Sequence, residues 1–224
     1  MKSLNNWLLV LSVLSCFGCS SPVHEDDRGC AFVSDSIQYR VEFMSAGCVR
    51  ILSFPEGDTL VTKRLVVDSE KPAFKDYKWE DTGQKLLFRT RELSVVFDKA
   101  DAAFIFQETS TGKLLLKEKG DRKARNFKRS VAGGEQCLEV TQCFVPTEDE
   151  AIYGLGQYQN GIMNYRGKSV LLLQANMDIV NPFLISTNGY GVLWDNYSST
   201  KFEDTKEGYS FTSEVGDALS LIHI

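Results

Sequence analysis

Histidine is almost absent from this sequence. Only two of the 224 residues are histidines, His24 and His223, so residues 25–222 contain none. The body of the chain therefore has no histidine that could act as a catalytic base or bind a metal ion. Basic residues are not in excess either, since 25 Lys and Arg face 30 Asp and Glu and the net charge is −5. We expect no nucleic-acid partner.

The cysteines of the body show no metal-binding pattern. Four of them follow residue 19, with no Cys-x-x-Cys pair among them: Cys30, Cys48, Cys137 and Cys143. Without histidine partners they predict no zinc site, and nothing else in the sequence indicates a cofactor. Cys137 and Cys143 lie on one predicted strand roughly 20 Å apart, too far for a disulfide. A bridge between Cys30 and Cys48 stays open, but we favour buried free thiols.

The first 18 residues are typical of a secretory signal peptide. Lys2 precedes the apolar run 7–14, which is shorter than the roughly 20 residues that a membrane-spanning helix needs. An uncleaved membrane anchor is the alternative. Residues 15–21 resemble a bacterial lipoprotein box, in which the thiol of one cysteine is modified with lipid.

Lipid modification is predicted at Cys19, which Gly18 precedes and Ser20 follows, with Cys16 as the alternative. We therefore expect a lipid-anchored protein of the bacterial cell envelope, in the periplasm or on the outer-membrane surface. Residues 19–30 are polar and acidic, which predicts a flexible tether.

Short strands are predicted throughout residues 31–218. Polar and apolar residues alternate from Ile37 to Phe43, with the period of two that is typical of a half-buried strand. Further strands are predicted over 49–51, 60–67, 85–89, 93–97, 103–107, 114–116, 138–142, 183–186 and 191–194. Turn residues at 110–112 and Asn188-Gly189 separate two of the pairs. Because no helical periodicity follows the signal peptide, we expect an all-β sandwich or barrel, with the basic stretch 117–129 as a solvated loop or edge.

Five segments resemble, in the same order, the N-terminal domain of glycoside hydrolase family 31. They are residues 92–97, 112–116, 151–157, 181–186 and 189–196. The resemblance covers about residues 31–218 and implies a galactose-mutarotase-like β-sandwich that packs on a catalytic (β/α)₈ barrel. The Gly-Leu-Gly-Gln sequence at 154–157, followed by residues 160–164, most resembles the α-xylosidase branch of the family.

The resemblance also implies where the chemistry lies. The family uses one aspartate as nucleophile and another as general acid/base, with retention of configuration. Both lie in the barrel, which needs roughly 250 residues. This chain contains no such region, so we assign no catalytic residue here and expect the barrel of the same polypeptide as a partner.

The last six residues, 219–224, are predicted to be translated adapter sequence. They can be encoded by CTG TCT CTT ATA CAC ATC, the transposon end used to fragment DNA for sequencing libraries. This hypothesis predicts that the chain is truncated before the barrel. A genuine apolar tail is the alternative.

One loop of the family's N-terminal domain reaches across the barrel mouth and shapes the sugar pocket. The matching stretch here holds Gln174, Asn176 and Asp178, which the resemblance implies as substrate-binding residues. Many members have aspartate where Asn176 stands. An amide both donates and accepts hydrogen bonds, but it lacks the charge-assisted bond. Tyr158 is predicted to offer an aromatic face to a sugar ring. The alternative for the loop is a surface loop without a function, and the alternative for Tyr158 is packing in the core.

Three functions remain open from the sequence. The favoured one is a carbohydrate-binding and supporting N-terminal domain of a retaining α-glycosidase, inactive alone, which predicts a bare apolar face where the barrel docks. The second is a free-standing carbohydrate-binding sandwich lipoprotein without catalysis, and the third a small enzyme that uses surface carboxylates. Aldose mutarotation in its usual form is excluded, because it needs a histidine.

Overall fold

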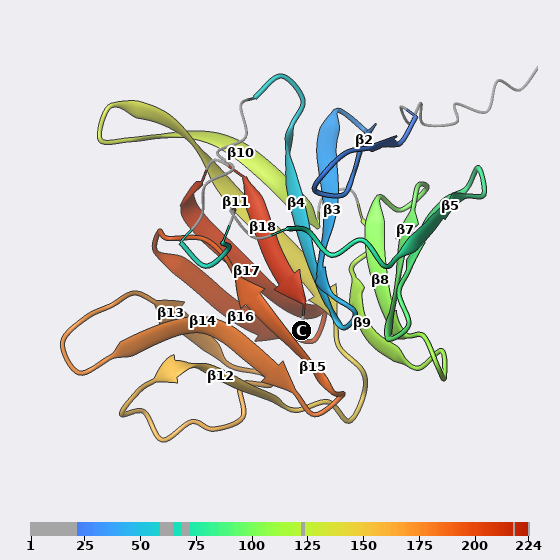
Figure 1. The fold of residues 1–224 in the computed structure, drawn as a ribbon. Coiled ribbons are helices and arrows are strands. Elements are labelled where there is room, and N and C mark those ends of the chain that lie inside the picture. The colour runs from blue at the N-terminus through green and yellow to red at the C-terminus, as the bar shows by residue number, and fades with distance from the viewer. Residues whose placement is uncertain (1–21, 59–64, 69–71, 122–123, 217, 224) are drawn as a thin grey trace, which may run out of the picture.

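Two antiparallel β-sheets, packed face to face, make up the described chain (Figure 1). The computed structural model describes residues 22–58, 65–68, 72–121, 124–216 and 218–223, and no helix occurs among them. The all-β sandwich predicted from the sequence is confirmed. The predicted signal peptide, with Cys16 and Cys19, lies outside the described residues. Within the described ranges no helix is long and apolar enough to cross a membrane.

The first sheet has eight strands in the order β1-β2-β3-β4-β18-β15-β14-β12. Their bounds are β1 His24–Glu25, β2 Cys30–Ser34, β3 Ile37–Ser45, β4 Cys48–Pro55, β12 Ile152–Gln157, β14 Ile179–Ser186, β15 Tyr190–Trp194 and β18 Leu219–His223. Asn188 and Gly189 join β14 to β15, as the sequence predicts, and Gly189 has a φ of 93°.

The second sheet has ten strands, nine of them in the order β13-β16-β17-β11-β9-β8-β7-β6-β5. Their bounds are β5 Lys78–Asp81, β6 Lys85–Arg89, β7 Leu93–Asp98, β8 Ala103–Glu108, β9 Leu114–Glu118, β11 Glu135–Val145, β13 Ser169–Leu172, β16 Thr200–Thr205 and β17 Gly208–Gly216. The tenth strand, β10 (Arg125–Ala132), pairs with β11 as a hairpin.

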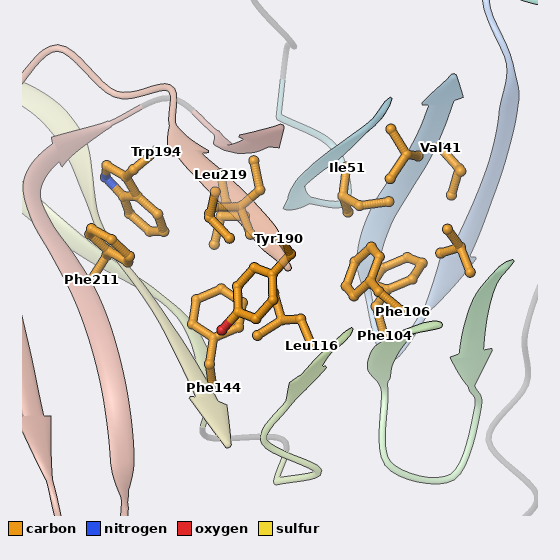
Figure 2. Close-up of a cluster of buried hydrophobic side chains, with 14 of the residues drawn as sticks. Val41, Ile51, Phe104, Phe106, Leu116, Phe144, Tyr190, Trp194, Phe211 and Leu219 are labelled. Carbon is orange, nitrogen blue, oxygen red and sulfur yellow. The ribbon is translucent and has the colours of Figure 1, made fainter. Parts of the chain in front are cut away.

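One aromatic-rich core lies between the two sheets. Figure 2 draws part of it, with side chains from both sheets in a single cluster. Trp194 stacks on Phe211 with ring centroids 5.1 Å apart, and its indole N–H donates to Ser213 at 2.8 Å. The predicted alternation of residues 37–43 places Tyr39, Val41 and Phe43 in this core, each 1% exposed. Large rings from both sheets therefore contribute to the contact that holds the layers together.

Several local expectations can be compared directly with the structure. The hairpin of residues 103–116 is confirmed as β8 and β9, and Gly112 in its turn has a φ of 71°. The strand expected over 60–67 is wrong for residues 65–67, which form bends, while 59–64 lie outside the described residues. The basic stretch 117–129 begins in β9 and ends in β10. Its Arg125 is buried, because it pairs with Glu118.

The four cysteines from residue 30 onward are free thiols. Burial raises the pKa of both Cys30 and Cys48 to about 11. The bridge left open between these two is therefore not formed in this structure. The prediction of free thiols is confirmed, but only Cys30 is buried, and Cys48, Cys137 and Cys143 are partly exposed.

The segment before β2 differs from the expected flexible tether. Backbone pairing joins His24 to Ala31 in the first sheet. Glu25 accepts hydrogen bonds from the Tyr77 hydroxyl at 2.8 Å and the Trp79 indole N–H at 3.0 Å. These partners lie about 50 residues away, so the local polar composition could not indicate them. Residues 24–30 belong to the folded sandwich.

Residues Leu219–His223 form β18 in the middle of the first sheet. Leu221 pairs with Ile51 of β4 on one side and with Trp194 of β15 on the other. Leu219 and Leu221 are 1% and 0% exposed. The hypothesis of adapter translation concerns the DNA, which a fold does not test, so it stays a prediction.

Asp26 supplies a pH-dependent contact at the start of the sandwich. Partial burial raises the pKa of its carboxyl, but hydrogen bonds from Arg40 and from the backbone N–H groups of Arg28 and Gly29 outweigh this and bring it to about 2, from 3.8. The Arg40 side chain lies 2.6 Å from an Asp26 oxygen. Because the folded-state pKa is lowered, the ionised group stabilises the fold above about pH 4. This contribution is lost as the pH falls toward 2.

We expect Asp26→Asn to lower the free energy of unfolding at pH 7 by up to about 1 kcal/mol, since the Asp26 side chain is 35% exposed and solvent screens the pair. The difference from wild type should disappear near pH 2. Urea unfolding at pH 7, 4 and 2 measures it, with the exposed neighbour variant Asp27→Asn as control. A difference that persists unchanged at pH 2 would contradict the assignment.

Candidate functional site

The candidate site is the loop of residues 173–178. It leaves β13 in the ten-stranded sheet and enters β14 in the eight-stranded sheet, so it crosses between the two layers at one end of the sandwich. β12, β13 and β14 lie together at that end (Figure 1). The loop is therefore anchored at one end in each of the two sheets.

Hydrogen bonds inside the loop hold its shape. The Gln174 amide nitrogen donates to the Asp178 carbonyl at 2.8 Å, and its oxygen accepts from the Val180 N–H at 3.1 Å. The Asp178 N–H donates to the Ala175 carbonyl at 3.3 Å. Both ends of the Gln174 amide are thus used within the loop. Gln174 is a brace of this loop in the structure.

Asn176 lies exposed at the tip between these hydrogen-bonded residues. Its neighbour Met177 is 67% exposed and has a φ of 70°, which turns the chain back toward Asp178. The structure thus brings Gln174 and Asp178 into contact and presents the Asn176 amide outward. An exposed amide held on a braced loop can donate to and accept from the hydroxyls of a sugar.

Tyr158 lies close enough to the loop for the charge of Asp178 to affect its pKa. It follows β12, packs against the hydrophobic core, and donates its hydroxyl hydrogen to the Leu155 carbonyl at 3.0 Å. Burial raises its pKa to about 12, and the charge of Asp178 contributes to the shift. The ring is half-buried, so most of its aromatic surface is taken by the protein.

Two glycines let β12 pair closely with β14. Gly154 and Gly156 have φ values of 98° and 124°, and Leu155 between them has 64°. A Cβ atom at Gly156 would lie 2.2 Å from the Ile179 carbonyl oxygen, and one at Gly154 would lie 2.4 Å from the Phe183 carbonyl oxygen. The Gly-x-Gly sequence is therefore required where the backbone of β14, which carries the loop, crosses β12.

A buried carboxylate anchors the same strands from inside. Glu150 accepts hydrogen bonds from the Ser186 hydroxyl at 2.6 Å and from the Tyr190 hydroxyl. Nearby, Arg166 forms an ion pair with Asp204 at 2.7 Å. These contacts tie the segment before β13 to the second sheet and the start of β12 to β14 and β15. The strands on either side of the loop are therefore fixed by buried polar contacts.

Exposed apolar side chains occur along β12 and β14 and in the loop, and the sequence did not indicate them as functional residues. Tyr153 and Ile185 face each other on β12 and β14 and are 37% and 50% exposed. Leu173, the first residue of the loop, and Ile179, the residue after it, are also exposed. The sequence of β14 could have indicated this exposed surface, because apolar residues occur on both faces of that strand.

Comparison with known proteins identifies the family to which this chain belongs. Residues 38–203 match the glycosyl hydrolase 31 N-terminal galactose mutarotase-like domain. The chain belongs to glycoside hydrolase family 31. The resemblance carried by the five sequence segments is thereby confirmed, and so is the galactose-mutarotase-like fold.

The relatives of this family 31 domain are longer enzymes. An α-xylosidase of Saccharolobus solfataricus is 34% identical over 178 residues, which cover 73% of this chain and 23% of that protein. A solved α-xylosidase of Xanthomonas citri has 31% identity and a TM-score of 0.72, over 82% of this chain and 20% of that one. A soil-metagenome α-xylosidase solved with xylose has 22% identity and a TM-score of 0.76, over 91% and 32%. The chain thus spans about a quarter of its curated α-xylosidase relative.

The close approach of β12 and β14 gives a mutational test. We expect Gly156→Ala to destabilise the family 31 domain by about 3 kcal/mol or more, because the added methyl meets backbone and the φ is positive. Gly161→Ala is the matched control, since Gly161 also has a positive φ of 70° but open space around its Cβ position. Thermal unfolding of both variants measures the difference. Equal losses would show that the φ alone matters and would contradict the packing argument.

Proposed function

We propose that this chain is the N-terminal domain of a retaining α-glycosidase of the α-xylosidase type. In this proposal it supports a catalytic barrel of the same polypeptide and frames the sugar pocket with the loop of residues 173–178. The observation that carries the proposal is the internally hydrogen-bonded loop, next to the strands β12 and β14 that expose apolar side chains.

The exposed apolar residues support a docking role. Tyr153, Ile185, Leu173 and Ile179 would bury apolar surface against a partner, and each buried side chain contributes about 1.5–3 kcal/mol when fully removed from water. We propose the barrel of the same polypeptide as this partner, because the chain covers only 23% of its α-xylosidase relative. The sandwich alone would then be inactive, since the nucleophile and the acid/base lie in the barrel.

We propose different roles for three residues of the loop and for Tyr158. Asn176 contacts a hydroxyl of the oligosaccharide substrate, since its amide is the exposed one at the tip. The Asp178 carboxylate accepts a second sugar hydroxyl. Gln174 positions the loop through its two internal hydrogen bonds. Tyr158, outside the loop on the chain after β12, offers the exposed part of its ring to the sugar.

A catalytic test needs the complete protein. We would read the source genomic DNA through the codon for Ala218 and produce whatever protein it encodes. If a barrel follows, we expect hydrolysis of α-xylosides, and Asn176→Ala should lower kcat/KM about tenfold or more, as loss of one or more substrate hydrogen bonds does. Asn126→Ala, an exposed amide on β10, is the matched control and should leave kcat/KM unchanged.

Other outcomes would overturn the proposal. An open reading frame that ends after Ile224 would reject both the barrel and the adapter hypothesis. Calorimetry of the chain itself against xylogluco- and malto-oligosaccharides would then decide for the free-standing carbohydrate-binding lipoprotein, if a monomer binds them tightly. An unchanged kcat/KM in Asn176→Ala would remove the loop from the substrate pocket.

We also propose that the protein is lipid-anchored in the bacterial cell envelope through Cys19. The support is the sequence of residues 1–21 alone. In cells fed a labelled fatty acid, Cys19→Ser should abolish incorporation and Cys16→Ser should retain it. The reverse pattern would move the lipid to Cys16, and labelling of neither protein would reject the anchor.

A further inference from the structure

Met177, at the tip of the loop, has a backbone conformation that a methionine does not favour. The Asp178 N–H donates to the Ala175 carbonyl, so residues 175–178 form a four-residue turn. Met177 is the third residue of this turn and has a φ of 70°. Turns with a positive φ at the third position usually carry glycine or asparagine there, because a Cβ atom crowds the backbone in that conformation. The backbone at Met177 is therefore strained.

The other non-glycine residues with a positive φ in the described chain each have a reason for it. They are Asp35, Ser36, Ala102 and Leu155. Asp35 and Ser36 are the two residues between β2 and β3, and the preferred two-residue hairpin turn needs a positive φ at both. Ala102 packs its single methyl group against the core. Leu155 is 0% exposed, so the burial of its side chain offsets the strain.

Met177 differs from these residues because its side chain is 67% exposed. The turn is held by Gln174, whose amide bonds the Asp178 carbonyl and the Val180 N–H. Residues that the surrounding structure holds in a strained conformation cluster at ligand-binding and active sites. The loop thus presents a large apolar side chain outward at a position where glycine would give a more stable backbone.

The chemistry of the loop tip fits a sugar ring. A pyranose has hydroxyl groups around its edge and C–H groups on its faces, so it needs polar and apolar contacts side by side. Asn176 is exposed next to Met177, and its amide can donate to and accept from a hydroxyl. The methionine side chain is unbranched and polarizable, so it adapts to an irregular apolar surface. These two adjacent residues offer both kinds of contact.

We propose that Met177 is a sugar-binding residue, whose thioether packs against the C–H face of the ring that Asn176 contacts through a hydroxyl. This inference rests on the proposed function, because the sugar pocket also needs the catalytic barrel. The contact gives a reason for methionine at this position, since binding sites commonly keep residues that lower the stability of the fold.

The first measurement is the thermal unfolding of the chain itself. Met177→Gly relieves the strain and should raise Tm by about 2 °C or more. Met163→Gly is the matched control, because Met163 is 77% exposed but does not have a positive φ. It should lower Tm, since glycine increases the conformational entropy of the unfolded chain. If Met177→Gly is no more stable than wild type, the strain argument is wrong and the inference is overturned.

The second measurement is the kinetics of the complete enzyme on a xylogluco-oligosaccharide. Met177→Gly should raise KM about tenfold at unchanged kcat, because an apolar contact at the edge of the pocket contributes equally to the ground state and the transition state. Met177→Asn accepts the positive φ without the flexibility of glycine and should raise KM in the same way. Met177→Leu keeps an apolar side chain of similar volume and should retain the wild-type KM, as should Met163→Gly.

The outcomes separate this inference from the proposed function. An active enzyme whose KM is unchanged by Met177→Gly overturns the inference and leaves the proposed function in place. If Met177→Gly lowers the Tm of the complete enzyme at unchanged KM, Met177 packs on the barrel, and the inference is also wrong. A gene without a barrel, or a complete protein without α-glycosidase activity, overturns the proposed function and this inference together.

Discussion

The first sheet is continuous only because β18 lies between β4 and β15. Those two strands are about 140 residues apart in sequence, and each needs a neighbour for the backbone groups on its inner edge. Backbone pairing of β18 places few requirements on the identity of its side chains. Leu219 and Leu221 face the core, while Ser220 faces the other side, where it bonds Asp195 at 2.8 Å and Arg50 at 3.1 Å. Any segment with apolar residues at alternate positions and a small hydroxyl between them would satisfy the same place, so the fold is compatible with either origin of these residues.

The buried charges on the outer side of that sheet could not be predicted from the alternation of polar and apolar residues. The alternation of Val49, Arg50 and Ile51 predicts that Arg50 faces solvent, yet it is 2% exposed. Its partners are Glu42 at 3.3 Å and Asp195 at 3.4 Å, the second 145 residues away. Period-two alternation reports which face a residue occupies, and it identified the core residues of 37–43 correctly. It does not report whether a loop or a distant carboxylate covers the other face. The same reason explains why the expected tether at 24–30 is folded.

The candidate site was predictable in part. The Gly-Leu-Gly-Gln motif carried part of the family resemblance, but the strand β12 that contains it was not predicted from the sequence. The reason for its glycines is the β14 carbonyl oxygen that would lie only 2.2 Å from a Cβ at Gly156, which only the structure supplies. The loop was located correctly as a connection, whereas the roles of its residues could not be separated. Gln174 and Asn176 carry identical functional groups, and the difference is that Gln174 spends both of its atoms on Asp178 and Val180. Which of the two amides is used within the loop depends on the backbone conformation of these few residues, and the amino-acid composition does not indicate that conformation.

The amide at Asn176 matters for the sugar-binding role that we propose for this loop. An aspartate there would place a second carboxylate two residues from Asp178 on an exposed tip, and like charges at that spacing raise the cost of ionising both. The neutral amide avoids this repulsion and still offers a donor and an acceptor to a hydroxyl. It also forgoes the stronger charge-assisted bond. In the proposed role, the contribution of this loop to sugar binding depends less on the strength of one contact than on the preorganisation that Gln174, the β12–β14 pairing and Glu150 give to its position, because a contact already in place costs less entropy when the sugar arrives.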